Sequence, residues 1–442
     1  AVGGLVVRND IRSQVIAEVD NVDGAAVEDF TVLALESATI EATLTGETKS
    51  LAAADAAATD APATDPATTD TSSTTDTTAT DSTAAGGPVT ASPLALNGLI
   101  ATNLVLSEAS AKISHSDLTV DGNLSIQADN ISTITAENSA SLESDGSAVG
   151  VTLAFNTIGW KPQNLFANAI DTLLGTDALG AEQPAVVSAM VLDTVFTVGG
   201  DVAVTAGGLD EDSEGPVGAS ITATISNETT ANAANASASF VLASHKVSSQ
   251  SQAWVGPLLP NAAAIDGATG SRIMDLVVGG NMDVVATDAG SIAAEVTMAA
   301  TSGGGTAVGG VVVMNDLRGD VLSTVDRVNL IAAGDVTIAA SEASSLTSTL
   351  SGTTESPAAD PAAEAGADAT GGATGGGASG GGVGEPTPMA VNALIANNVV
   401  LGSSRAILTK SQVQAEGGLT VQAENVADIT AENTATMSSG GK

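Results

Sequence analysis

The side chains best suited to acid–base or nucleophilic chemistry are scarce in this sequence. Its two histidines, His115 and His245, lie neither in an HExxH pattern nor beside a GxSxG turn, so neither has the neighbours of a metalloprotease or hydrolase site. Cysteine is absent, which removes the thiolate nucleophile and the sulfur ligand of metal sites. The glycine-rich stretch 303–310 leads into a strand-like segment rather than a helix, so it does not form a phosphate cradle. We therefore expect that the chain is not an enzyme and has no catalytic residue.

Cation binding has one candidate segment. In LDEDSEG, residues 209–215, the acidic residues Asp210, Asp212 and Glu214 alternate before a glycine, as in a short calcium loop. The segment lacks the bidentate glutamate of a helix-loop-helix calcium site, because the twelfth position from Asp210 is Ile221. Calcium bound by these three carboxylates is therefore one prediction and a plain acidic turn is the other. No other cofactor is expected.

Sugar chemistry on a repetitive β-structure needs clustered carboxylates, usually with arginine or lysine to hold an anionic sugar. Six arginines spread over 442 residues make such a cluster a poor fit. The polar residues Asn9, Asp10 and Arg12 do recur together, 306 residues later. Residues that return at a fixed interval indicate a repeated structural feature rather than one catalytic centre. A polysaccharide-active β-helix enzyme is therefore a minor alternative.

The overall charge excludes several classes of partner. The chain has 51 acidic and 12 basic residues, which gives a formal net charge of −39. Nucleic acids and anionic bilayers select basic surfaces, so neither is an expected partner. No stretch approaches the roughly 20 apolar residues of a membrane-spanning helix, so we expect no transmembrane segment. Aromatic residues make up 2% and tyrosine is absent, so a core must be built from Ala, Val, Ile and Leu.

The sequence repeats itself at two intervals. AVGGLVVRNDIRSQVIAEVD at 1–20 returns as AVGGVVVMNDLRGDVLSTVD at 307–326, an offset of 306. LALNGLIATNLVL at 94–106 returns as MAVNALIANNVVL at 389–401, an offset of 295. The segments between the two blocks differ in length while the blocks keep their register. One unit of about 300 residues and half of the next are present, so we expect the chain to be part of a longer tandem array.

A shorter motif predicts the strands. It consists of a glycine or acidic residue, a polar residue, and then alternating apolar and small polar positions. Its copies begin at Glu28, Gly122, Gly200, Gly280, Gly334 and Gly418. Alternation places Val202 and Val204 on one face of a strand and Ala203 on the other. Many short strands separated by Gly, Asn and Asp turns favour an all-β fold, a parallel β-solenoid (β-helix) with a narrow aliphatic interior.

Composition divides the chain into solenoid and loop segments. We assign 1–46 to solenoid coils, 94–352 to solenoid with two insertions, and 389–442 to the coils of the next repeat. Residues 47–93 are an Ala/Thr/Asp low-complexity loop, and residues 353–388 are a Gly/Ala-rich loop. Such compositions cannot bury a core, so both loops are expected to be disordered. Glycosylation of the Thr-rich loop is left open.

Two insertions break the strand pattern. In KPQNLFANAIDTLLG, residues 161–175, apolar residues recur at helical spacing, which predicts one short helix. A second insertion, AWVGPLLP, forms an aromatic loop within 250–266. The apolar side chains of both insertions either cover the solenoid or contact a neighbouring molecule. The predicted assembly contacts are Trp160, Leu165, Phe166, Ile170, Leu173, Leu174 and Trp254.

The segments AVGG, NDIR, the VD pair and GDVTIAA resemble the repetitive β-helical stalks of giant bacterial surface proteins, of the filamentous-haemagglutinin and giant-adhesin kind. The resemblance covers most of the chain outside the loops, as a style of repeat. It implies export, an extracellular or bacterial cell-surface location, and a role in adhesion or in building a matrix.

These observations predict an extracellular structural protein, a solenoid segment that forms a stiff stalk, filament or surface layer by self-association with neighbouring repeats or copies. The main alternative is a calcium-rigidified adhesin extender of tandem immunoglobulin-like sandwiches, although each such domain usually carries a core Trp or Tyr. An ice-binding solenoid is a third alternative, in which flat threonine rows would order water. Against it, the threonines of this chain concentrate in the loops. A receptor or surface glycan is left open as a partner.

Overall fold

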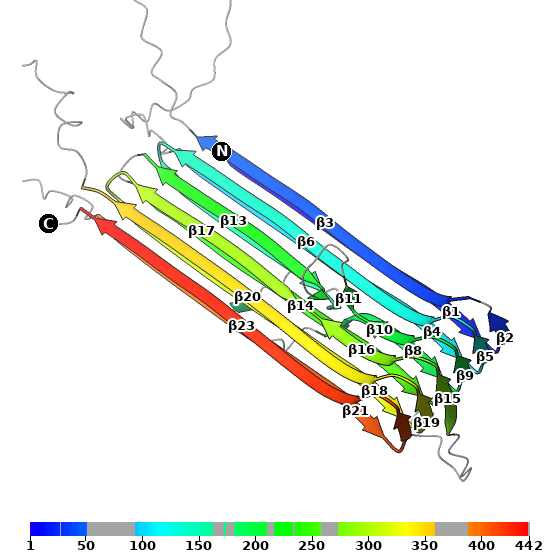
Figure 1. The fold of residues 1–442 in the computed structure, drawn as a ribbon. Helices are drawn as coiled ribbons and strands as arrows, with labels where there is room; N and C mark the ends of the chain where they lie inside the picture. Colours follow the sequence, from blue (N-terminus) through cyan, green and yellow to red (C-terminus); the bar gives the residue numbers. More distant parts are fainter. Residues whose placement is uncertain are drawn as a thin grey trace, which may run out of the picture.

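The computed structural model describes residues 1–26, 28–50, 93–161, 172–173, 181–209, 216–232, 235–257, 273–358 and 388–440. These residues form six stacked coils, and each coil passes through three parallel sheets that we term A, B and C. Figure 1 shows the two long sheets, A and C, face to face, with the short sheet B joining them at one end. The prediction of a parallel β-solenoid is confirmed.

The first two coils have the simplest path. Coil 1 consists of β1 (Val2–Asp20) in sheet A, β2 (Asp23–Ala26) in sheet B and β3 (Phe30–Ser50) in sheet C. Coil 2 consists of β4 (Leu94–Ser114), β5 (Asp117–Val120) and β6 (Leu124–Ser144) in the same order. A strand of 21 residues, such as β3, spans about 70 Å at roughly 3.3 Å per residue, so each coil is wide and flat.

Coils 3 and 4 contain interruptions. Coil 3 consists of β7 (Ser147–Ile158) and β8 (Ala185–Leu192) in sheet A, β9 (Val195–Val198) in sheet B, and β10 (Val202–Ala206) and β13 (Ser220–Ala231) in sheet C. A small antiparallel hairpin, β11 (Gly208–Leu209) with β12 (Pro216–Val217), separates the last two. Coil 4 consists of β14 (Ser237–Gly256), β15 (Met274–Val278), β16 (Met282–Asp288) and β17 (Ser291–Ser302).

The last two coils return to the simple path. Coil 5 consists of β18 (Thr306–Asp326), β19 (Val328–Ala332) and β20 (Val336–Ser356). Coil 6 consists of β21 (Met389–Thr409), β22 (Gln412–Ala415) and β23 (Leu419–Ser439). Their resemblance to coils 1 and 2 is the structural counterpart of the repeated sequence blocks.

Strand pairing explains the two sequence offsets. In sheet B, Asp23 lies opposite Asp117, and the equivalent residues of successive coils are 94, 78, 80, 54 and 83 positions apart. The first four intervals add to 306 and the last four add to 295, which are the offsets of the two sequence blocks. The sequence therefore repeats every four coils, while the backbone path repeats every coil.

Every copy of the short motif begins the sheet C strand of its coil. Its first apolar residues form one register row, Phe30, Leu124, Val202, Met282, Val336 and Leu419. Val202 and Val204 are fully buried and Ala203 is partly exposed, as the alternation predicts. Aliphatic side chains are sufficient here because packed sheets lie only about 10 Å apart.

The core between sheets A and C is divided into aliphatic clusters. The largest lies beside sheet B and includes Ile113, Val204 and Val284. The second lies further along the strands and includes Val105 and Leu317. Between and beyond these clusters, buried polar residues recur at fixed register positions, so the interior has polar columns that run along the solenoid axis.

Several sequence predictions fall at the edges of the described residues. β3 continues to Ser50 and β20 to Ser356, so each strand reaches four residues into a segment assigned to a loop. Most of both loops lies outside the described residues. The helix predicted for 161–175 also lies almost wholly outside them, since only Lys161, Thr172 and Leu173 are described, the last two with helical backbone.

The pairing of the strands also decides between two predicted architectures. All strand pairs of sheets A, B and C in the described residues are parallel. Immunoglobulin-like sandwiches are antiparallel. The alternative of tandem immunoglobulin-like sandwiches is therefore wrong for this part of the chain.

Candidate functional site

An asparagine column runs along the axis inside the solenoid. Successive sheet A strands place one buried or half-buried polar residue at the same register position: Asn9, Asn103, Asn156, His245, Asn315 and Asn398. Asn9 Nδ2 donates to Asn103 Oδ1 at 2.8 Å, and Asn103 Nδ2 donates to Asn156 Oδ1 at 2.7 Å. In the last two coils Asn315 Nδ2 donates to Asn398 Oδ1 at 2.8 Å. Asn103 and Asn156 each accept a hydrogen bond from one neighbouring coil and donate one to the other, so the bonds pass from coil to coil.

His245 interrupts this column in coil 4. Its ring is fully buried, and its Nδ1 lies 3.0 Å from Asn156 Nδ2. Burial lowers the pKa of His245 to about 4, so the ring is neutral at neutral pH and its Nδ1 accepts the amide hydrogen. Nε2 of His245 and Oδ1 of Asn315 have no hydrogen-bond partner among the described residues. The column therefore has a break between coils 4 and 5.

A second polar column, the carboxylate seam, lies nearer sheet B. It consists of the sheet C residues Glu36, Asn130, Asp288, Glu342 and Asn425. Serines of sheet A face its buried members across the interior. Ser13 donates to Glu36, and Ser249 donates to Asp288. These two hydrogen bonds connect the two sheets, whereas those of the asparagine column connect the coils.

Two carboxylates of the seam are neighbours on adjacent strands. Asp288 and Glu342 lie opposite each other in the pairing of β16 with β20, and they are 4% and 0% exposed. Burial raises the pKa of Asp288 to about 6; the hydrogen bond from Ser249 opposes this shift and the charge of Glu342 adds to it. Burial likewise raises the pKa of Glu342, against the hydrogen bond from Ser344. Asp288 and Glu342 therefore hold protons more tightly than exposed carboxylates do.

Neither β10 nor β13 of coil 3 reaches the seam, because the long strands of this coil are interrupted near its level. In sheet A, β7 ends at Ile158 and β8 begins at Ala185, which lies opposite Ser249. In sheet C, the β11–β12 hairpin follows the end of β10. A groove of about 590 Å³ opens at the sheet A break, lined in part by Ser13 and Ser107. Both insertions of coil 3 thus leave the solenoid at the level of the polar seam.

A third column is exposed at the turn between sheets B and C. The side chains of Asp29, Asn123, Asp201, Asn281 and Asp335 each accept a backbone N–H of the next coil, at 2.5 to 2.9 Å. These residues are the polar second position of the strand motif. In coil 6 this place is taken by Gly418, which donates its N–H to Asp335 and has no side chain to continue the ladder. The polar position of the motif is therefore a hydrogen-bond acceptor that aligns successive coils.

The turn between sheets A and B places a left-handed residue at the same point of five coils. Asn21, His115, Asp193, Arg327 and Lys410 have φ between 45° and 55°. The backbone N–H of Asn21 donates to the carbonyl of Ser114 in the next coil at 3.0 Å, and those of His115, Asp193 and Arg327 make the same bond to their next coils. Asn and Asp tolerate this conformation, but it costs other residues roughly 1–2 kcal/mol. Contacts of the turn side chains must offset that cost.

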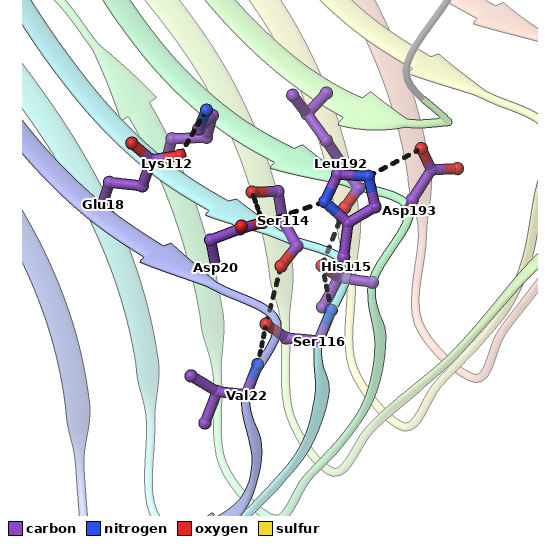
Figure 2. A network of polar contacts seen from close by, with 10 residues as sticks. Glu18, Asp20, Val22, Lys112, Ser114, His115, Ser116, Leu192 and Asp193 are labelled. Carbon is purple, nitrogen blue, oxygen red and sulfur yellow. Dashed lines mark hydrogen bonds and ion pairs between the residues drawn. The ribbon is translucent and has the colours of Figure 1, made fainter.

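Figure 2 shows such contacts around His115. Nδ1 of His115 lies 2.9 Å from Asp20 Oδ1, and the same oxygen accepts a hydrogen bond from Ser114 Oγ at 2.7 Å. Nε2 of His115 points toward Asp193, with 3.9 Å between Nε2 and Oδ2. The hydrogen bonds from His115 and then Ser114 lower the pKa of Asp20. From its place in coil 2, the imidazole thus connects coils 1 and 3.

The chemistry open to this network is limited by its geometry. A cavity of about 450 Å³ lies beside His115 and is lined by Asp23, Asp117 and Asp193. Ser114 donates to Asp20 rather than to the imidazole, so its hydroxyl is not activated as a nucleophile. Within the described ranges, no group of three or more His, Cys, Asp or Glu side chains is placed to hold a metal ion. The contacts of this network connect three successive coils.

Trp160, one of the predicted assembly contacts, is buried within the chain at 3% exposure. The cationic groups of Lys246 and Arg318 each lie 4.8 Å from the centre of its ring. Arg318 also pairs with Asp316 at 2.6 Å and with Glu182 at 3.2 Å. Trp160 forms a backbone bridge with Glu182. These contacts hold both ends of the coil 3 insertion against the outer face of sheet A.

The remaining predicted site residues are dispersed. Leu165, Phe166, Ile170 and Leu174 lie outside the described residues, as do the three calcium-site carboxylates Asp210, Asp212 and Glu214. Leu173 is described and 63% exposed. Trp254 is half-buried on β14, opposite Met190 on one side and Thr324 on the other. Contact of these residues with another molecule and calcium binding stay predictions.

The outer face of sheet C carries hydroxyl rows that sequence analysis missed. One row has a hydroxyl in every coil: Thr45, Ser139, Ser226, Thr297, Ser351 and Thr434. The neighbouring row includes the carboxylates of Glu137, Glu295 and Glu432. The row consists of three threonines and three serines, so hydroxyl groups form a strand ladder although the threonines are most concentrated in the loops. The rows emerge only when the register between dissimilar strands is known.

Comparison of the chain with protein-family models, with curated proteins and with solved structures finds no match. Among the described residues, no helix is long and apolar enough to cross a membrane. The function is therefore inferred from the columns and faces of the solenoid.

Proposed function

We propose that this chain is an extracellular structural protein, a solenoid segment that builds a stiff stalk, filament or surface layer together with neighbouring repeats or copies. The observation that carries the proposal is the set of open strand edges. Sheets A, B and C begin with β1, β2 and β3, and they end with β21, β22 and β23. In the described part of the chain, no strand pairs with the outward edges of these six strands. Open edges invite further pairing, so the stack is suited to continue at both ends.

The asparagine column supports the same role. Asn9 directs its amide nitrogen to coil 2, and Asn398 directs its amide oxygen to coil 5. An amide oxygen therefore remains for a further coil at one end of the column, and an amide nitrogen remains at the other. A coil added at either end would meet the complementary group of a further asparagine. The column thus has a polarity that fits continuous stacking.

The cellular setting follows from charge and from the resemblance to giant surface proteins. A net charge of −39 favours solubility and opposes unspecific pairing between the strand edges of different molecules. A bacterial surface location, and adhesion to a receptor or surface glycan, are part of the proposal on the strength of the resemblance. No catalytic role is included in it.

Cryo-electron microscopy of the native assembly tests the proposal. We expect maps or power spectra with a continuous axial repeat of about 4.8 Å that extends past coils 1 and 6. Non-solenoid caps that cover β1 to β3 on one side and β21 to β23 on the other would overturn it. Such caps would leave a closed domain with no edge for further coils.

The hydroxyl rows of sheet C favour one second candidate, an ice-binding surface. Hydroxyls repeat about 4.8 Å apart across the strands and roughly 6.6 Å apart along them, which is a regular array able to order water. The glutamates in the neighbouring row weaken this candidate, because charged groups bind water in their own geometry. A freezing-hysteresis assay on the intact chain tests it, and the absence of hysteresis would exclude it.

A further inference from the structure

The outer face of sheet A is apolar at the end far from sheet B. One register row has a branched aliphatic residue in every coil: Val6, Ile100, Leu153, Leu242, Val312 and Ile395. A second apolar row lies four residues earlier on each strand, with one row between the two: Val2, Leu96, Val149, Ala238, Val308 and Val391. Val6 and Ile395, on the two end strands, are 73% and 57% exposed, and the four residues of the first row that lie between them are half-buried. These two rows and the row between them are called the apolar face below.

The row between them is uneven in height. It consists of Gly4, Gly98, Val151, Phe240, Gly310 and Ala393. A Cβ built on Gly98 would meet no atom within 4 Å, so the surface above this glycine is open. Phe240 projects from the same row and is 42% exposed. The apolar face therefore has a hollow over coils 1 and 2 and a ridge at Phe240 of coil 4, whose ring also lies against Gly310 of coil 5.

A groove of about 280 Å³ lies beside the ridge. It is lined almost wholly by apolar side chains, among them Leu153, Phe240, Val312 and Ile395. Leu173, from the insertion between β7 and β8, stands at its edge and is itself 63% exposed. Aliphatic and aromatic groups of a partner would fit this groove, whereas charged groups would lose their hydration there.

The size of the apolar face suits a specific protein interface. Six strands about 4.8 Å apart and roughly six residues of about 3.3 Å each give a rectangle on the order of 600 Å². Two such faces in contact would bury a total of about 1,000 Å² or slightly more, which is the lower range of specific interfaces. An exposed apolar patch of this size on a soluble protein usually marks an interaction site.

Charge decides which occupant fits best. Surfaces that lie on membranes combine an apolar face with many Lys and Arg residues, and anionic bilayers attract such clusters. The row next to the apolar face has one cation in six coils, Arg8, and the chain as a whole carries a net charge of −39. A lipid surface is therefore disfavoured, and a second apolar face of the same shape is favoured.

We infer that a second copy of this chain packs face to face on the apolar face of sheet A, with the Phe240 ridge of each copy seated in the glycine hollow of the other. Sheets packed in this way lie about 10 Å apart and interdigitate their side chains. A ridge and a hollow on one face make the surface self-complementary, which a two-fold interface requires. The inference rests on the proposed structural role and adds the surface by which rods associate side by side.

Analytical ultracentrifugation of the intact chain tests the inference with two opposite substitutions. Phe240→Thr removes the ridge, and Gly98→Val fills the hollow with a residue that the free chain accommodates. Each is expected to weaken association about tenfold or more while the melting temperature stays within a few degrees of the unsubstituted chain. Thr224→Val, on the outer face of sheet C, is the matched control and should leave association unchanged. Added salt should strengthen association, because it screens the repulsion between two acidic chains.

The contrary outcomes are distinct. A chain that stays monomeric across the micromolar range overturns the inference, whether or not it binds neutral lipid vesicles. So does a Gly98→Val variant that associates as tightly as the unsubstituted chain or more tightly, because added apolar area would then outweigh the lost hollow. Association that all three variants leave intact indicates contact through the open strand edges, which overturns the inference and still supports the proposed rod.

Discussion

The asparagine column and the carboxylate seam lie in the same core, a few residues apart along the strands, yet they are built differently. Asn103 accepts a hydrogen bond from the coil before it and donates one to the coil after it. Asp288 has a second carboxylate, Glu342, as its neighbour on the next strand and accepts its hydrogen bond from Ser249 of the opposite sheet. The first column links coils, and the second links sheets.

The difference follows from what each group can do. A neutral amide has both donors and acceptors, so a row of amides satisfies itself along the axis. An ionised carboxylate only accepts, so adjacent carboxylates repel each other and need donors from elsewhere. A stacked fold can therefore extend an amide column without limit, whereas each carboxylate in its interior must be supplied with a donor or a proton.

The largest change in stability is expected when a carboxylate replaces an amide in the asparagine column. Asn103→Asp removes the donation to Asn156 and buries a charge without a cationic partner. We expect a loss of about 3–5 kcal/mol in the free energy of unfolding at neutral pH, measured by urea denaturation. Ser125→Asp, on the outer face of the same coil, is the control and should change stability by less than about 0.5 kcal/mol. Equal effects of the two substitutions would show that the column is not sensitive to charge.

The second test uses pH to separate the two columns. The pKa of Asp288 is raised to about 6, so between about pH 4 and 6 the folded chain holds a proton that the unfolded chain has released, and stability rises by about 3 kcal/mol as the pH falls through this range. The pKa of His245 is lowered to about 4, so over nearly the same range the unfolded chain binds the extra proton and stability falls by about 3 kcal/mol. In the unsubstituted chain the two effects oppose each other.

Urea denaturation at about pH 7 and about pH 4 should reveal each effect when the other residue is replaced. Relative to the unsubstituted chain, Asp288→Asn should lose stability on acidification, and His245→Asn should gain it. Because other carboxylates titrate in both variants, the difference from the unsubstituted chain is the quantity to compare. Variants that shift in the same direction would contradict the opposed roles of seam and column.

A smaller effect is expected from repairing the asparagine column. His245→Asn restores at coil 4 the residue found at the same position of the other five coils, and its amide nitrogen can reach the unpaired Oδ1 of Asn315. We expect a gain of about 1 kcal/mol at neutral pH. Thermal unfolding followed by circular dichroism would measure it. A loss of stability would mean that the cavity left by the imidazole outweighs the new hydrogen bond.

The smallest change in stability is expected in the exposed ladder, the column of Asp and Asn acceptors at the turn between sheets B and C. Asp201→Ala removes one acceptor at the turn between sheets B and C, where the backbone N–H of Asn281 can turn to water instead. We expect a loss of about 0.5–1 kcal/mol in the free energy of unfolding, and Asp121→Ala, in the equivalent turn of coil 2, should change it less. A loss as large as that of Asn103→Asp would mean that the exposed ladder contributes as much to the free energy of unfolding as the buried asparagine column does.

Much of the fold is predictable from local patterns. The motif that begins at Gly200 has the period-two alternation of a strand, and it correctly predicts which of its residues are buried. The two offsets show that the chain repeats, because coils at the same place in a four-coil unit retain similar residues. These properties depend on residues close in sequence or on direct self-similarity.

The columns and faces were not predictable in the same way. Asn156 and His245 are neighbours in space but 89 residues apart, and no shared local motif marks them as partners. The intervals between equivalent residues of successive coils vary from 53 to 94, so a row across the coils cannot be counted out along the sequence. The ridge at Phe240 and the hydroxyl row at Thr297 emerge only from the strand register.

The flat shape of each coil has a mechanical consequence. The cross-section of the solenoid is about 70 Å wide but only two sheets thick, with about 10 Å from sheet to sheet, so it is much wider than it is thick. The bending stiffness of an elastic beam grows with the cube of its depth in the plane of bending. A stack of these coils should therefore flex across its thin dimension while it resists bending in the plane of its sheets. Force applied to such a structure would be resisted in a direction-dependent way.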